Sequence, residues 1–131
     1  MLVAGEGDPW PSIWDGVYTT AQATRGEAIY RAKCGSCHGA NLEGLGGAPP
    51  LVGKYFTWDW DGTGVDNLYE KIYYTMPDDR INRLTPKESA DVLGYLLKMN
   101  RFPEGPRELA ADAENLRTIR FEEGRGGLRG F

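Results

Sequence analysis

The sequence lacks three features that would place it in other classes of protein. It contains no run of 18 apolar residues, which excludes a transmembrane helix within it. Its 15 Lys and Arg are outnumbered by 19 Asp and Glu, and the formal net charge of −4 argues against a basic nucleic-acid-binding surface. Its first residues hold no apolar signal core, because Gly5, Glu6 and Asp8 follow Met1 almost at once. What remains, 131 residues of which 40% are hydrophobic, is typical of one globular domain with a single core.

Cysteine, histidine and methionine are also scarce, with two, one and three copies in the chain. Both cysteines and the histidine fall in one pentapeptide, Cys34-Gly35-Ser36-Cys37-His38, which is the C-x-x-C-H pattern of c-type haem attachment. Thiols at this spacing can each add to one vinyl group of a porphyrin, and the histidine that follows can coordinate the iron. The pattern predicts one haem c bound through Cys34 and Cys37, with His38 as the proximal ligand.

Three other uses of these residues are less favoured. A zinc site normally needs four Cys or His ligands, and the chain has three such residues in total. A thioredoxin-like dithiol would need a βαβ context, of which the sequence shows no sign. A disulfide between Cys34 and Cys37 would close a loop of two intervening residues and would stabilise little.

Three segments carry the signals of helices. The first is expected to begin after Thr19 and the third after Thr85, since capping patterns follow both threonines. The second is expected to have Asp66 as its cap and to end before Pro77, because the residue before a proline avoids the helical region. Glycines and prolines in residues 39–50 predict a loop. No alternating strand pattern is present, so the predicted fold class is all-α, with three to five helices and long loops.

We expect a central domain over residues 19–100, an N-terminal arm over 1–18 and a C-terminal extension over 101–131. The arm is expected to be extended, and the extension to contain a short helix within 109–116. Three apolar side chains of the arm are expected to dock on the domain: Trp10, Ile13 and Trp14.

The second axial ligand of the iron has to come from a short list. Ligation by two histidines is excluded, because His38 has no counterpart in the chain. Met1 is terminal, and Met99 fits the packed face of the third helix. Met76 lies at a helix end beside Pro77, from which a thioether could point into a haem cleft. We therefore predict Met76 as the distal ligand, with simple packing as its alternative role.

Between about residues 20 and 100 the sequence resembles the class I c-type cytochromes, specifically the small bacterial mono-haem kind. The motifs that carry the resemblance are, in chain order, Gly26 with Tyr30, Cys34–His38, Pro49–Gly53, Met76 with Pro77, and Gly94–Leu96. The resemblance implies a cytochrome c fold wrapped around one haem, with the first helix crossing the last at the two glycines. It also implies that the backbone carbonyl of Pro49 accepts a hydrogen bond from His38, which would orient the ring and raise its basicity.

Burial of the haem would need a wall of apolar side chains, and its propionates would need hydrogen-bond donors. The expected wall consists of Leu51, Val52, Tyr55, Leu68, Ile72 and Leu93. Trp58 and Trp60 could donate indole N–H groups to the propionates, or could serve as ordinary packing.

Histidine and methionine together would fill both axial positions, which favours a soluble one-electron carrier over an enzyme. The resemblance implies an extracytoplasmic, periplasmic location, with a processed or recombinant start at Met1. It implies a dehydrogenase as electron donor and an oxidase or another cytochrome as acceptor. Segments Trp14–Tyr18 and Pro103–Pro106 resemble those of cytochromes associated with quinoprotein dehydrogenases. Two alternatives stay open: a haem enzyme or gas sensor with a labile or absent Met76 ligand, and a structural or filament-forming subunit.

A group of acidic residues surrounds the expected haem loops: Asp59, Asp61, Asp66, Asp78 and Asp79. Such a group would attract a basic docking patch on a partner protein and make association depend on salt. It could equally serve solubility alone.

Overall fold

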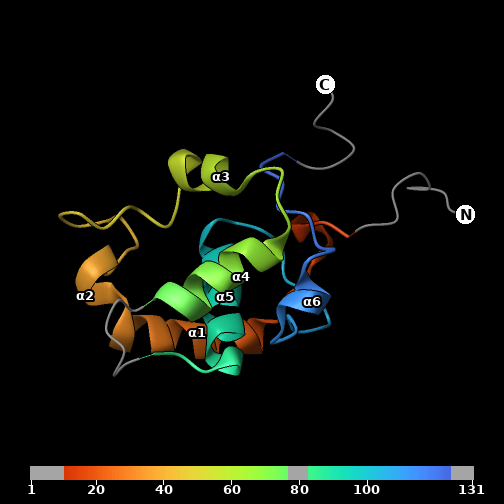
Figure 1. Cartoon of the computed structure of the whole chain (residues 1–131), viewed down its shortest axis with the longest axis horizontal. Helices are drawn as coiled ribbons and strands as arrows, with labels where there is room; N and C mark the ends of the chain where they lie inside the picture. The colour runs from red at the N-terminus through yellow and green to blue at the C-terminus, as the bar shows by residue number, and fades with distance from the viewer. Residues whose placement is uncertain (1–10, 77–82, 125–131) are drawn as a thin grey trace, which may run out of the picture.

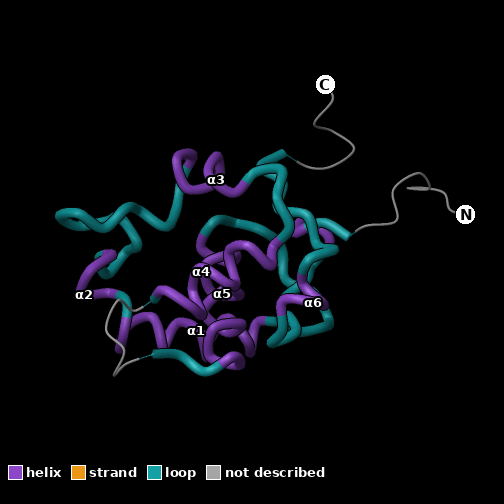
Figure 2. The backbone as a smooth tube through the Cα atoms, viewed as in Figure 1, coloured by secondary structure: helices purple, strands orange, loops and turns teal. Residues whose placement is uncertain are grey.

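The computed structural model describes residues 11–76 and 83–124, and the regular elements within these ranges are all helices. They are η1 (Ile13–Asp15), α1 (Thr20–Lys33), α2 (Gly35–His38), α3 (Lys54–Trp60), α4 (Val65–Thr75), α5 (Pro86–Met99) and α6 (Ala113–Leu116). Long loops separate α2 from α3 and α5 from α6 (Figures 1 and 2). The predicted all-α class and its long loops are confirmed. None of the helices in the described ranges combines the length and apolar character needed to cross a membrane.

The predicted caps of α1 and α5 are present. The side chain of Thr19 accepts a hydrogen bond from a backbone N–H three residues on, at 3.0 Å. Thr85 caps α5 in the same way, and Glu88 completes a reciprocal capping box by accepting from the Thr85 N–H at 2.9 Å. Both pairs satisfy N–H groups that have no partner within the helix.

The predicted cap of α4 is wrong. Gly64 is the N-cap, and Asp66 lies inside the first turn. A carboxylate in the first turn interacts favourably with the positive end of the helix, so an acid there does not have to be the cap. Pro77, the expected stop, lies outside the described residues, and α4 ends at Thr75.

Helices α1 and α5 cross in close contact, as the resemblance implies. A Cβ built on Gly26 would lie 1.9 Å from the backbone carbonyl oxygen of Asp91, so only glycine fits there. One turn further along, the rings of Tyr30 and Tyr95 lie 5.6 Å apart between centroids. This crossing fixes the position of the C-terminal end of α1, and α2 begins two residues after that end.

The N-terminal segment is partly helical where we expected an extended arm. Ser12 and Asp15 form a capping box around the single turn η1. Ile13 is fully buried, and the half-buried ring of Trp14 meets Phe102 edge-on at 4.7 Å between centroids. These two residues dock as expected, whereas Trp10 lies outside the described residues.

Residues 119–123 form what we call the clasp, a segment hydrogen-bonded to residues 61–65 on one side and 11–13 on the other. On the first side, N–H groups of Gly62, Phe121 and Val65 donate to carbonyls across the gap at 2.8 Å each. On the second side, Ile13 and Arg120 donate at 3.1 and 2.9 Å. In Figure 1 this blue segment lies beside both η1 and the chain between α3 and α4. The expected helix over 109–116 is confined to its last four residues, α6.

Candidate functional site

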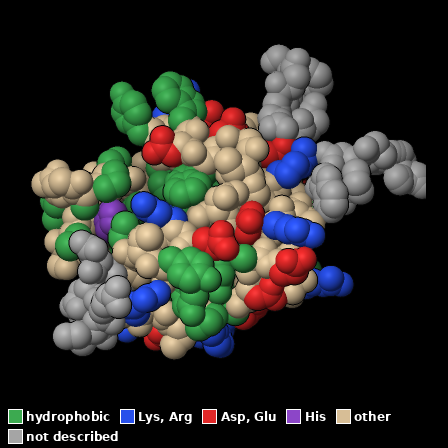
Figure 3. All heavy atoms as spheres, viewed as in Figure 1, with side chains coloured by type: hydrophobic (Ala, Val, Ile, Leu, Met, Phe, Trp, Pro, Cys, Tyr) green, Lys and Arg blue, Asp and Glu red, His purple; other side chains and the backbone are tan. Residues whose placement is uncertain are grey.

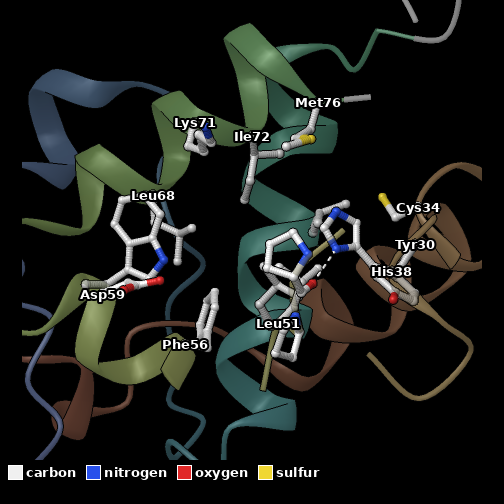
Figure 4. Close-up of a pocket in the computed structure, with 15 residues that line it drawn as sticks. Tyr30, Cys34, His38, Leu51, Phe56, Asp59, Leu68, Lys71, Ile72 and Met76 are labelled. Carbon is white, nitrogen blue, oxygen red and sulfur yellow. Dashed lines mark hydrogen bonds between the residues drawn. The ribbon is translucent and has the colours of Figure 1, made fainter. Parts of the chain in front are cut away.

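A cavity of about 480 Å³ opens between α2, α3, α4 and α5 (Figure 4). This volume lies within the range of sites that hold small molecules and cofactors. The cavity is lined by Tyr30, Cys34, His38, Pro49, Pro50, Leu51, Phe56, Asp59, Trp60, Leu68, Lys71, Ile72, Met76, Val92 and Leu96. Most of these side chains are apolar. The polar groups form two sets, with His38 and Cys34 on one side and Asp59, Trp60 and Lys71 on the other.

His38 ends α2 and is 7% exposed. Its Nδ1 lies 2.8 Å from the carbonyl oxygen of Pro49, which is the hydrogen bond that the resemblance implies. Because a carbonyl can only accept, Nδ1 must carry the hydrogen, and Nε2 keeps its lone pair. A histidine held in this tautomer can bind a metal through Nε2, and the bond to Pro49 fixes the plane of the ring.

The two cysteines occupy different positions around the single turn of α2. Cys34 lines the cavity and is half-buried, whereas Cys37 is exposed, and both are free thiols. Burial, with a smaller contribution from Cys37, raises the pKa of the Cys34 thiol to about 11. Backbone bonds from Cys37 and His38 to the Cys34 carbonyl, at 3.1 and 3.0 Å, hold the turn together.

Met76 lies at the C-terminal end of α4, where its N–H still donates to the Ile72 carbonyl at 3.1 Å. Its backbone is extended, and its half-buried side chain lines the cavity together with His38 and Cys34 (Figure 4). Met99 lies at the end of α5, is 39% exposed and lines a separate groove. The structure thus brings Met76, and not Met99, to the cavity that holds His38.

The two tryptophans of α3 point in opposite directions. Trp60 lines the cavity beside Asp59, but Trp58 is 57% exposed and does not reach it. Residues two apart on an α-helix are separated by about 200° around its axis, so one face cannot hold both. Of the two indoles that could donate to haem propionates, only Trp60 therefore lines the cavity. Lys71 of α4, which sequence reasoning missed, adds a second possible donor to this cavity.

Three of the six expected wall residues, Leu51, Leu68 and Ile72, line the cavity. The others do not: Val52 lines the separate groove near Met99, Tyr55 is 76% exposed, and Leu93 is a residue of α5 that is fully buried in the core. The wall on α5 consists of Val92 and Leu96 instead. These two residues lie four positions apart and so share one face of α5. The spacing of apolar residues did not show which face of the helix is turned towards the cavity.

Phe56 and Tyr30 are wall residues that sequence reasoning missed. Phe56 belongs to α3, a helix whose aromatic sequence gave no helical signal and which is anchored by burial of Phe56 and Thr57. Tyr30 donates its hydroxyl to the carbonyl of Gly39 at 2.5 Å, which ties α1 to the residue that follows His38. Burial is the main reason that the pKa of Tyr30 rises to about 12, so the donor keeps its proton.

The expected acidic group is only partly described. Asp59 and Asp61 are exposed, Asp66 is half-buried, and Asp78 and Asp79 lie outside the described residues. The described residues include no cluster of three or more His, Cys, Asp or Glu able to hold a metal ion, so the zinc alternative finds no ligand set among them.

The donor set fits a haem c. An imidazole with a free Nε2, a thioether and a thiol share one apolar cavity, and Trp60 and Lys71 supply polar groups at its edge. Histidine and methionine are the axial ligands of cytochromes c.

Comparison with known proteins places this geometry in a family. The family described as cytochrome c oxidase, cbb3-type, subunit III matches residues 21–96. Thiosulfate dehydrogenase of Thiomonas intermedia (strain K12) is 38% identical over 89 residues, which cover 63% of this chain and 28% of that protein. The crystal structure of the sulfane dehydrogenase SoxCD from Paracoccus pantotrophus has the same fold, with a TM-score of 0.54 and 20% identity over 90% of this chain and 64% of that chain.

The chain thus spans less than two thirds of each of these relatives, so their activities do not transfer with the fold. The family match covers more than half of the chain and includes the C-x-x-C-H turn, both crossing glycines and Met76. The chain therefore belongs to the cytochrome c oxidase, cbb3-type, subunit III family, and it is a class I c-type cytochrome, a haem domain for electron transfer.

Proposed function

We propose that the chain carries one haem c, attached through Cys34 and Cys37, with His38 and Met76 as axial ligands. The observation that carries the proposal is the bond from His38 Nδ1 to the Pro49 carbonyl. It leaves Nε2 as the ring nitrogen whose lone pair is free to bind iron. Cys34 and Met76 line the same cavity. We further propose that residues 19–100 form the haem-binding unit.

Bound haem would supply one-electron chemistry at its iron. With His38 and Met76 both on the iron, no position stays open for a substrate or for oxygen, so we propose a carrier and not an enzyme. The apolar walls disfavour the extra charge of the oxidised centre and so raise the reduction potential. Trp60 and Lys71 are positioned to donate to haem propionates, and Asp59 adds a negative charge beside them.

We propose that the carrier works outside the cytoplasm, between a dehydrogenase and an oxidase or another cytochrome. The sequence alone suggested a quinoprotein dehydrogenase as the donor. The relative from Thiomonas is named a thiosulfate dehydrogenase, which favours an enzyme that oxidises a reduced sulfur compound. We therefore propose a dehydrogenase of a reduced sulfur compound as the donor, with a quinoprotein dehydrogenase as the alternative.

Mass spectrometry under denaturing conditions tests the attachment. The chain, produced in a bacterial strain that matures c-type cytochromes, is expected to gain the mass of one haem and to keep it after denaturation. Cys34→Ala combined with Cys37→Ala is expected to abolish the gain. An unmodified polypeptide from the competent strain would contradict the proposal.

Matched methionine variants test the axial ligand. Met76→Ala is expected to convert the low-spin spectrum to a high-spin one, to lower the reduction potential and to allow rapid binding of carbon monoxide. Met99→Ala, the control, removes the same atoms from the end of α5 and is expected to leave all three unchanged. Rapid carbon monoxide binding by the unaltered protein would favour the alternative of a haem enzyme or gas sensor.

A direct assay separates a carrier from an enzyme. The purified holoprotein is expected to be reduced by chemical reductants and reoxidised by ferricyanide, without catalysing the oxidation of thiosulfate by ferricyanide. Steady turnover with thiosulfate would overturn the carrier proposal and leave the haem site intact.

A further inference from the structure

The outer face of α3 carries two aromatic side chains in solvent. Tyr55 is 76% exposed and Trp58 is 57% exposed, and their rings meet edge-on with centroids 6.1 Å apart. They lie three residues apart and so share one face of the helix. In Figure 3, hydrophobic side chains protrude from the edge of the molecule where Figure 1 places α3, with acidic side chains beside them. Exposed tyrosine and tryptophan side by side are typical of protein-binding surfaces.

The charges around this aromatic pair are mostly negative. Asp59 and Asp61 are exposed on the last turn of α3 and directly after it. Asp61 is held in place, because its Oδ1 accepts from the backbone N–H of Glu123 at 2.7 Å. Two cations lie near these residues. Lys71 lines the cavity together with Asp59, and the Lys54 ammonium lies 6.0 Å from the centre of the Trp58 ring, where a cation–π contact stabilises the position of the indole.

The same helix forms part of the cavity wall on its other side. Phe56 and Trp60, four residues apart, line the cavity, and Phe56 is 4% exposed. A helix with its side chains is about 10 Å across. A protein docked on Tyr55 and Trp58 would therefore be separated from the cavity by a single helix.

We propose that Tyr55 and Trp58, together with the carboxylates of Asp59 and Asp61, form a docking surface for a basic redox protein that exchanges electrons with this cytochrome. The inference rests on the proposed function, because it assigns a partner class to the haem in the adjacent cavity. The aromatic pair supplies the buried centre of the interface, and the carboxylates supply attraction and orientation.

Charge decides against a second copy of the chain as the occupant. Two identical surfaces would bring Asp59 and Asp61 towards their own counterparts, and the chain as a whole has a formal charge of −4. Like charges across an interface are repelled, whereas lysine or arginine side chains of a partner would pair with them.

Stopped-flow kinetics test the surface with a defined probe, the lysine-rich mitochondrial cytochrome c. The variant Tyr55→Ser with Trp58→Ser is expected to slow electron exchange with this probe about tenfold at low salt, as removal of an interface centre does. Tyr74→Ser is the matched control, since Tyr74 is a tyrosine of α4 with 62% exposure. It is expected to change the rate less than about twofold.

The carboxylates are tested by salt. Asp61→Asn keeps an oxygen that can accept from Glu123 but removes the charge. It is expected to slow exchange at low ionic strength and to flatten the salt dependence, with rates that converge on the unaltered protein at high salt. An unchanged salt dependence would overturn the steering by Asp61.

Two internal readouts separate this proposal from the proposed function. The double variant is expected to keep the visible spectrum, the reduction potential and the rate with ferricyanide, a small oxidant that needs no docking. If the unaltered chain holds no haem, the proposed function fails. If it holds haem and the double variant exchanges with the probe as fast as before, the docking surface alone is refuted. A concentration-dependent dimer that the double variant abolishes would also refute it, in favour of self-association.

Discussion

Gly26 of α1 and Asp91 of α5 are in backbone contact, and a Cβ on Gly26 would lie 1.9 Å from the Asp91 carbonyl oxygen. Alanine at position 26 has to push the two helices apart. Its better helix propensity, worth about 1 kcal/mol, does not offset overpacking against a rigid backbone. Gly26→Ala is expected to lower the free energy of unfolding by about 2 kcal/mol, measured by urea denaturation of the holoprotein.

Gly94 provides the control for this prediction. It lies in the middle of α5, but a Cβ there would meet side-chain atoms and no backbone, with Gln22 Cγ at 3.3 Å and Tyr18 Cβ at 3.5 Å. Gly94→Ala is expected to change the free energy of unfolding by less than about 1 kcal/mol in either direction. Equal losses in the two variants would show that the backbone contact between Gly26 and Asp91 is not the cause.

The buried carboxylate of Asp91 lies between two cations, Arg25 and Lys87. Its side chain is 5% exposed and accepts from Arg25 at 3.1 Å and from Lys87 at 3.3 Å. Asp91→Asn is expected to cost about 2 kcal/mol of stability, as loss of a charged hydrogen-bond partner does. Glu27→Gln breaks the exposed pair with Arg31 and is expected to cost less than about 0.5 kcal/mol, because solvent screens that pair. Denaturant melts of both variants check the difference.

Because of Tyr30, the free energy of unfolding is expected to depend on pH in the alkaline range. Its pKa rises from 10.0 to about 12, chiefly through burial, so the folded state favours the neutral phenol. The stabilisation is complete below pH 10, where the unfolded chain keeps its proton as well, and it is lost as the pH rises through 12. Tyr30→Phe is expected to cost about 1 kcal/mol at neutral pH, with the loss of the bond to Gly39.

Comparing the two proteins as a function of pH separates the effect of the Tyr30 hydroxyl from that of the other ionisable groups. The difference in unfolding free energy between the unaltered protein and Tyr30→Phe is expected to shrink from pH 10 upwards, because only the phenol ionises. A difference that stays constant up to pH 12 would contradict the assignment.

Phe121 of the clasp supports the cavity wall from behind. Its fully buried ring packs 6.2 Å from Phe56 and 5.6 Å from Phe102, between centroids. Phe121→Ala is expected to cost about 3 kcal/mol and, by letting water approach the haem through α3, to lower the reduction potential. Leu116→Ala, a truncation of an equally buried residue in α6 away from the cavity, is expected to cost a similar amount and leave the potential unchanged. Protein-film voltammetry measures the potentials.

Local signals were the most predictable part of this molecule. Thr19 and Thr85 mark their helices through hydrogen bonds that span three residues, and the Cys34–His38 turn has its ligand chemistry within five residues. The cytochrome fold was implied by the resemblance of these motifs, in their order along the chain, to those of class I cytochromes c. The Asp66 cap was wrong because an acid in the first turn has the same sequence signature as a cap.

Features that depend on tertiary packing could not be predicted. Helix α3 has little propensity of its own and owes its place to burial of Phe56 against Phe121, far along the chain. Because its helical phase was unknown, Trp58 and Trp60 could not be told apart. The clasp is joined to residues 61–65 and 11–13 by backbone hydrogen bonds, which any residue except proline can donate and which therefore give no signal in the sequence.

The clasp also bears on the order in which the molecule is completed. Trp14 donates its indole N–H to the carbonyl of Glu122, 108 positions away, at 3.0 Å, so this seam needs nearly the whole described chain. Contacts between such distant segments form late in folding, because a long loop must close first. The α1–α5 crossing joins Gly26 to Asp91, which are 65 positions apart, and the contact of Phe121 with Phe56 that backs α3 spans the same distance. We therefore expect the Trp14–Glu122 seam, which closes the longest of these loops, to form after the crossing and after the backing of α3, so that η1 is the last helical turn to be fixed to the molecule.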